Sequence, residues 1–102
     1  MAVIAVTTDT FEKEVLQDAN TVLVDFWADW CGPCRMVSPI IDQVSIERPD
    51  VKVCKVNIDE QPDLAVRYHV MSIPALLVFR QGQVVQTAVG ARPKTAILGL
   101  LE

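Results

Sequence analysis

The fold is decided by residues 21–34, which read TVLVDFWADWCGPC. Residues 21–27 are β-branched, aromatic and almost continuously apolar, a pattern typical of a strand buried on both faces of a parallel sheet. Cys31 and Cys34 follow, and apolar residues recur at helical spacing from Cys34 onward. This stretch therefore predicts a central strand that leads through a Cys-x-x-Cys pair into a helix.

Strand and helix patterns alternate along the rest of the chain. We expect strands over 3–6, 21–27, 51–58, 75–79 and 84–89, and helices over 9–17, 34–48, 62–68 and 94–101. Asp9 followed by Glu12 predicts a capping box at the start of the first helix. The alternation requires crossover connections, and the hairpin adds antiparallel strands. The predicted fold class is α/β, a three-layer α/β/α sandwich around a mixed central β-sheet, built as a single domain over residues 1–102.

Composition limits the classes of function. The 102 residues include 9 basic and 13 acidic side chains, a net charge of −4, and 51% are hydrophobic, which is enough for a core without crosslinks. The absence of a Lys/Arg cluster argues against binding to nucleic acid or to anionic membranes. No apolar run in the sequence is long enough for a membrane span, and residues 2–6 are too short for a signal peptide. We expect a cytoplasmic protein that starts near Met1 and acts on small molecules or other proteins.

The cysteine pair has the setting of a reactive site. It stands where a buried strand ends and a helix begins, the place where ligands gather in open α/β sheets. Backbone N–H groups and the helix dipole favour a thiolate at a helix N-terminus, so the pKa of Cys31 should fall most. Residues three apart share a helix face, which makes a disulfide between Cys31 and Cys34 geometrically accessible. Pro33 is preset for the first helical turn.

Two alternatives to a redox pair remain open at this point. Cys54 and the sole histidine, His69, can in principle complete a zinc site with Cys31 and Cys34, or the spacing can be a coincidence. The position of Cys54 in the middle of a core-like strand and the lack of a second Cys-x-x-Cys weigh against zinc. We expect Cys54 to be a buried, unreactive thiol.

Charged and aromatic residues flank the pair. Asp25 lies in a strand that should be buried, where desolvation raises its pKa and keeps it protonated, unless a turn at the strand edge satisfies it. Lys55 is the one cation in residues 53–58 and either pairs with Asp25 or points outward. We expect Trp27 to pack in the core and Trp30 to line the mouth of the site.

Residues 24–35, VDFWADWCGPCR, resemble the active-site segment of the thioredoxin family. Later landmarks of that family follow in matching order, namely Lys55-Val56-Asn57-Ile58-Asp59, Ile73-Pro74, Gly82 and Val89-Gly90. The Trp-Cys-Gly-Pro-Cys string with these landmarks in register is highly specific, and the match covers residues 11–90. The resemblance implies the thioredoxin fold, protein-disulfide reduction, and a cis peptide bond before Pro74 that brings the Ile73 backbone beside the cysteines.

The resemblance also assigns roles to individual residues. It implies that Cys31 attacks a substrate disulfide, that Cys34 resolves the mixed disulfide, and that Asp25, through water and tuned by Lys55, accepts the Cys34 proton. The implied substrate-binding residues are Trp30, Gly32, Pro33, Ile73, Pro74, Gly90 and Ala91. The implied partners are a thioredoxin reductase and disulfide-containing substrate proteins. We expect a monomer with no metal and no other cofactor, serving electron transport and cell redox homeostasis.

The sequence departs from the family's pattern at a few positions, and rival functions exist. Relatives usually have Gly where His69 and Ser72 stand, which predicts a strained backbone at His69, and Ala75 replaces a common Thr. An oxidase or isomerase of the same fold is one rival, but Gly-Pro between the cysteines favours a reductant. A redox-inert module that holds partner chains in the groove around Trp30 is a rival of another class.

Overall fold

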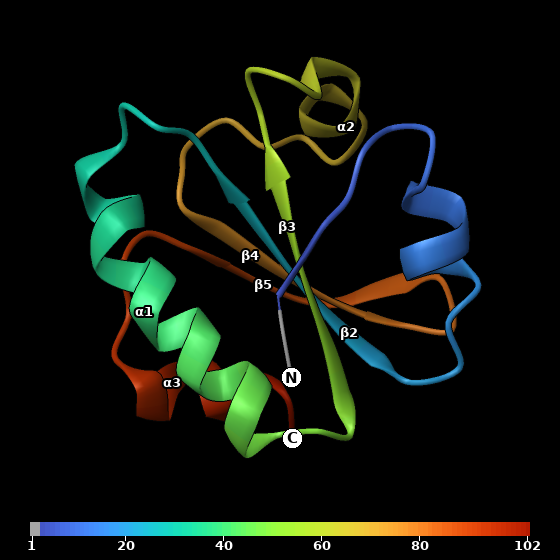
Figure 1. The fold of residues 1–102 in the computed structure, drawn as a ribbon, viewed down its shortest axis with the longest axis vertical. Coiled ribbons are helices and arrows are strands. Elements are labelled where there is room, and N and C mark those ends of the chain that lie inside the picture. The colour runs from blue at the N-terminus through green and yellow to red at the C-terminus, as the bar shows by residue number, and fades with distance from the viewer. Residues whose placement is uncertain (1–2) are drawn as a thin grey trace.

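The computed structural model describes residues 3–102, so the expected start near Met1 lies outside the described residues. The elements are β1 (Ile4–Ala5), η1 (Glu12–Leu16), β2 (Thr21–Trp27), α1 (Gly32–Glu47), β3 (Val51–Asn57), α2 (Pro62–Arg67), β4 (Ala75–Arg80), β5 (Gln83–Val89) and α3 (Lys94–Leu100). Their order matches the predicted one (Figure 1). Within residues 3–102 no helix has both the length and the apolar character needed to cross a bilayer.

The sheet is mixed, as predicted, with strand order β1-β3-β2-β4-β5. β3 runs parallel to β1 and β2, whereas β4 runs antiparallel to β2 and β5. β2 is the central strand, and its apolar residues from Val22 to Phe26 have no exposed surface. This position explains why its sequence is almost continuously apolar, because both faces of the strand are covered.

Helices cover both faces of the sheet, which confirms the three-layer sandwich. η1 and α2 lie on one face, and α1 and α3 lie together on the other (Figure 1). Side chains of β2 alternate between these layers: Val24 and Phe26 pack with Phe11 of the η1 side, and Leu23 packs with Val37 of α1. Burying each such side chain contributes roughly 1.5–3 kcal/mol. The same alternation places Asp25 on the α1 face.

The first helix differs from the expected one. It is the π-helix η1, which begins at Glu12, and no side chain caps it, so the predicted Asp9 capping box is wrong. The preceding residues close a turn of their own, because the Thr10 N–H donates to the Thr7 carbonyl at 3.1 Å and the Thr7 N–H donates to Thr10 Oγ1 at 2.9 Å. The hydrogen bonds at the start of η1 thus join Thr7 to Thr10 rather than Asp9 to Glu12.

Left-handed backbone shortens the hairpin and ends α2. Gln81 and Gly82 have φ of 52° and 78°, so a two-residue turn joins β4 to β5, shorter than the expected connection over residues 80–83. A Cβ on Gly82 would lie 3.0 Å from the Leu16 carbonyl oxygen, which explains the glycine.

The backbone after α2 is also left-handed, since His69 has a φ of 56°, which confirms the predicted strain. Ser72 does not have a positive φ.

Candidate active site

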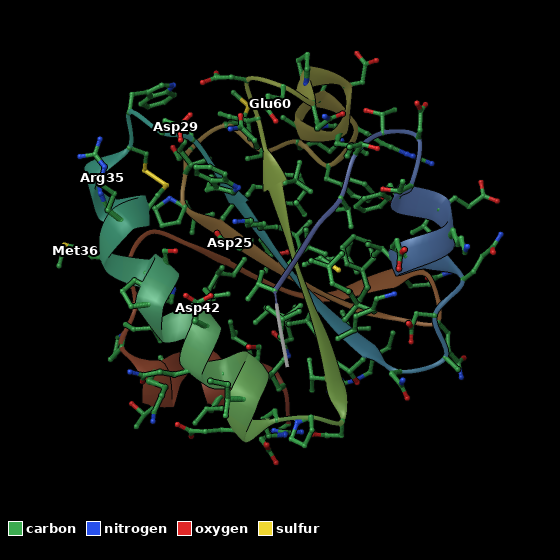
Figure 2. All side chains as sticks on the ribbon, in the orientation of Figure 1. Asp25, Asp29, Arg35, Met36, Asp42 and Glu60 are labelled. Carbon is green, nitrogen blue, oxygen red and sulfur yellow. A yellow bond between two sulfur atoms is a disulfide. The ribbon has the colours of Figure 1, made fainter. Side chains whose placement is uncertain are left out.

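Cys31 and Cys34 form a disulfide at the N-terminus of α1, with their Cα atoms 5.3 Å apart (Figure 2). The helix begins at Gly32, earlier than the expected Cys34, because Cys31 itself is the N-cap residue. Its backbone is extended, its Sγ accepts a hydrogen bond from the Cys34 N–H at 3.1 Å, and Pro33 lies in the first turn. A helix N–H group therefore points at the sulfur of Cys31.

Cys31 and Cys34 are equally buried, since each is 4% exposed in the disulfide form. Cys31 is covered because it packs against Ala28 and Ile73, and its Sγ lies 3.8 Å from the Ile73 carbonyl oxygen. The two cysteines differ instead in their polar surroundings. Cys31 receives the helix N–H, and Cys34 lines a cavity that contains Asp25.

The bond between Ile73 and Pro74 is cis, as the resemblance implied. The Gly90 N–H donates to the Pro74 carbonyl at 2.8 Å, and Gly90 has a φ of 94°. Three segments that are far apart in the sequence, those of Cys31, Pro74 and Gly90, therefore meet at one end of the sheet.

The predicted substrate-binding residues outside the cis-proline segment lie in two hollows and at the start of α1. Trp30 and Ile73 line a groove of about 250 Å³, whose other lining residues are Ile58, Val70, Met71 and Ser72. Ala91 lines a separate hollow of about 280 Å³ between α1 and the loop before α3. Gly32 and Pro33 are exposed at the start of α1, between Trp30 and the rest of the helix.

Asp59 belongs to this mouth, although it was not among the predicted site residues. Trp30 is 65% exposed, as expected for a mouth residue, and its Nε1 donates to Asp59 Oδ2 at 2.8 Å. Asn57 Oδ1 accepts the N–H groups of Asp59 and Glu60, and this turn ends β3 just before the expected Ile58. The membership of Asp59 in the family landmark at residues 55–59 was the available signal.

Asp25 is 5% exposed and lines a cavity of about 80 Å³ beneath α1 (Figure 2). Its Oδ1 is buried and has no hydrogen-bond partner among residues 3–102. Burial raises the pKa of Asp25 to about 7, and the charge of Lys55 acts in the opposite direction. The alternative of an Asp satisfied by a turn at the strand edge is wrong, because Asp25 lies inside β2, paired with Lys55 and Leu76, and its Oδ1 has no partner within residues 3–102.

Lys55 is opposite Asp25 in the sheet register and lines the same cavity. In the part of the chain that the structure describes, Lys55 forms no ion pair. Its Nζ lies 5.5 Å from the ring centroid of Trp27, a cation–π arrangement. Trp27 also lines the cavity and its buried Nε1 lacks a partner in residues 3–102, so it belongs to the site as well as to the packing. Its position two residues after Asp25 on the same strand face was the available signal.

Cys54 lies on the other side of the sheet. Its side chain packs with Val24 and Phe26 in the layer of η1 and α2, opposite to the face that holds Asp25. This placement contradicts the zinc alternative, because the sheet separates Cys54 from Cys34. Burial raises the pKa of Cys54 to about 12. Among residues 3–102 no group of three or more His, Cys, Asp or Glu side chains is placed to hold a metal ion.

Cys54 should stay unlabelled when the folded, reduced protein is treated with iodoacetamide, while Cys31 is labelled first. At about pH 8 a thiol of pKa about 12 is ionised to roughly one part in 10⁴, and only the thiolate reacts. Peptide mass spectrometry after timed quenching measures the order of labelling. The same reaction in urea is the control, in which Cys54 should react. Labelling of Cys54 at the rate of Cys31 in the folded protein would contradict its burial.

Comparisons with known proteins agree with this geometry. The family model Thioredoxin matches residues 2–102. Thioredoxin 1 of Synechococcus elongatus is 53% identical to this chain over 104 aligned residues, which cover 100% of this chain and 97% of that protein. Thioredoxin of Streptomyces clavuligerus is 50% identical over 91% of this chain and 87% of its own length. The chloroplastic M-type thioredoxin of Chlamydomonas reinhardtii is 46% identical over 96% of this chain and 71% of that protein.

The matches cover 97% of the Synechococcus protein and 87% of the Streptomyces protein, and the Cys-x-x-Cys pair of this chain forms a disulfide. The chain therefore belongs to the thioredoxin family, a family of thiol–disulfide oxidoreductases.

Proposed function

We propose that this oxidoreductase works as a protein-disulfide reductase in which Cys31 attacks and Cys34 resolves. The observation that carries the proposal is the polar difference between the two sulfurs. The Cys34 N–H points at Cys31 Sγ from 3.1 Å, which stabilises negative charge on that sulfur. Cys34 alone of the two cysteines lines the Asp25 cavity, where a proton acceptor is available.

In the first step the Cys31 thiolate forms a bond to one sulfur of a substrate disulfide. The substrate S–S bond breaks, and the other substrate sulfur leaves as a thiolate that takes a proton from water. The product is a mixed disulfide between Cys31 and the substrate.

In the second step Cys34 loses its proton to the Asp25 carboxylate through water in the cavity, and its sulfur attacks Cys31 Sγ. The bond between Cys31 and the substrate breaks, and the second substrate thiolate leaves. The enzyme ends as the Cys31–Cys34 disulfide, the substrate has gained two electrons, and Asp25 returns its proton to solvent. Lys55 tunes Asp25, since its charge lowers the pKa that burial raises.

Substrate chains would bind in the grooves around the disulfide. The residues proposed for this contact are Trp30, Gly32, Pro33, Ile73, Pro74, Gly90 and Ala91. The exposed indole of Trp30 and the apolar groove beside Ile73 support contact with apolar side chains of a substrate. The Gly90 backbone beside Pro74 supports contact with an extended substrate backbone.

A thioredoxin reductase would supply the two electrons, and the acceptors would be disulfide-containing proteins. The proposed setting is the cytoplasm, with the chain acting as a monomer and as one domain over residues 1–102, in electron transport and cell redox homeostasis. Nucleic acid and membranes are not proposed partners, in keeping with the net charge of −4 and the lack of a basic cluster in the sequence.

Reduction of insulin disulfides with dithiothreitol as the electron source tests the function. The parent should accelerate insulin precipitation, and the rate with the Cys31→Ser/Cys34→Ser double variant should be at least about 1,000-fold lower. Cys54→Ala is the matched control, since it removes the third thiol, and it should retain the activity. A parent that gives no turnover, together with a double variant that still binds partner proteins, would favour the redox-inert binding module.

A further inference from the structure

Ser38 lies one helical turn after Cys34 on α1, so the two side chains share a helix face. It lines the 80 Å³ cavity together with Asp25 and Lys55. It also lines a second hollow of about 120 Å³, which contains Asp29 and Arg35 but not Asp25. Ser38 therefore lies where the cavity around Asp25 meets a hollow nearer the surface.

The hydroxyl of Ser38 is available for a partner in the cavity. A serine inside a helix often donates its hydroxyl to a carbonyl of the preceding turn. Ser45 of the same helix does so, since its Oγ donates to the Asp42 carbonyl at 2.7 Å. Ser38 makes no such bond within residues 3–102, and it is exposed.

The cavity also contains polar atoms that need partners. Asp25 Oδ1 and Trp27 Nε1 are buried without a hydrogen bond among the described residues. A site of about 80 Å³ has room for water, which needs roughly 10–15 Å³ and two to four polar partners. Asp25, the Cys34 thiol of the reduced protein and the Ser38 hydroxyl supply those partners.

We propose that Ser38 is a positioning residue whose hydroxyl holds the water that carries the proton from Cys34 to Asp25. This inference rests on the dithiol mechanism proposed above. The water accepts the Cys34 proton and donates a proton to the Asp25 carboxylate, so the water is regenerated and charge moves from Asp25 to the Cys34 sulfur. The second O–H of this water donates a hydrogen bond to Ser38 Oγ. The Ser38 hydroxyl in turn donates to water in the outer hollow.

Few charged groups surround this path. Lys55 on β3 faces the cavity, and Asp29 and Arg35 line the outer hollow, where the Arg35 guanidinium donates to the Asp29 carbonyl at 2.7 Å. The β4 neighbour of Asp25 is the apolar Leu76. A pH profile of proton transfer through the cavity therefore reports chiefly on Asp25 and Cys34.

The test is a rapid-quench, single-turnover reaction of the reduced protein with a disulfide peptide from about pH 6 to about pH 10. Acid quenching and mass spectrometry separate formation of the mixed disulfide from its resolution. Ser38→Ala should slow resolution about fivefold near neutral pH, the effect of about one hydrogen bond, and leave formation unchanged. The difference in resolution rate between Ser38→Ala and the parent should disappear toward about pH 10, where Cys34 ionises without help from Asp25.

Two controls separate this role from a structural one. Ser38→Thr keeps the hydroxyl and should resolve the mixed disulfide at nearly the parental rate. Ser45→Ala removes the other serine hydroxyl of α1 and should leave the pH profile unchanged. Alanine is a good helix former and Ser38 is exposed, so the Ser38→Ala protein should fold.

Parental resolution by Ser38→Ala across the pH range would overturn the inference. Equal slowing of both steps at every pH would overturn it too, because that result indicates a general structural effect. If the parent itself shows no second step that depends on Cys34, the proposed mechanism fails, and this outcome differs from a failure of Ser38 alone.

Discussion

The Cys34→Ser protein should accumulate mixed disulfides with its substrates, whereas the Cys31→Ser protein should form none. Without Cys34 the bond between Cys31 and the substrate has no internal attacker, so the reaction stops after its first step. Without Cys31 the sulfur that receives the helix N–H is gone. Each change should lower turnover by about 1,000-fold or more, because the two sulfurs act as one unit. A non-reducing gel shows the trapped species as bands that dithiothreitol removes.

The double variant is the control for this experiment, since it should trap nothing. Trapping by the Cys31→Ser protein, with none by the Cys34→Ser protein, would reverse the assigned roles. Because both cysteines are equally buried in the disulfide form, this reversal is a real test of the polar difference between them.

Asp25→Ala should make the protein more stable than the parent above about pH 7. Burial raises the folded-state pKa of Asp25 from the usual 3.8 to about 7, so the native state binds an extra proton between those values. The contribution of Asp25 to the free energy of unfolding is fully present below its pKa in the unfolded state. This contribution is lost as pH rises through its pKa in the folded state. Alanine at this position has no charge to bury, so the variant escapes that loss.

The size of the effect follows from the two pKa values. Their separation corresponds to on the order of 4 kcal/mol, and the lack of an ion pair with Lys55 leaves that cost largely in place. Urea unfolding of the disulfide form at about pH 4 and about pH 8 measures it. The stability of the variant relative to the parent should rise by about 4 kcal/mol between these two conditions.

Activity should change in the opposite direction. Asp25→Ala should resolve mixed disulfides at least about tenfold more slowly near neutral pH, because Cys34 loses its proton acceptor. Asp25→Asn is the matched control, since it keeps the shape of the side chain and removes its charge. It should show the same loss of pH-dependent stability and the same slow resolution. A variant that is less stable than the parent at about pH 8 and reduces insulin at the parental rate would contradict both the cost of burial and the role as a base.

Local sequence determined the elements and the chemistry at their junction. The element order was predictable because it depends on interactions between residues that are close in the sequence. These interactions produce the apolar run of β2, the helical spacing after Cys34 and the turn residues. The same holds for the Cys-x-x-Cys pair, because a disulfide between Cys31 and Cys34 depends on one helical turn. Where local rules competed, as at Asp9, a turn closed by Thr7 and Thr10 prevailed.

Tertiary structure decided what surrounds that junction, because sheet order and register set which face each side chain occupies. Side chains alternate between the two faces along β2 and β3, so Asp25 and Lys55 lie on the α1 face and Cys54 lies on the other face. The sheet therefore separates the third thiol from the dithiol. Packing against Ile73, which lies far along the chain, buries Cys31 as deeply as Cys34. The cavity that joins Asp25 to Ser38 exists only where α1 crosses the sheet, and no pattern within either segment contains it.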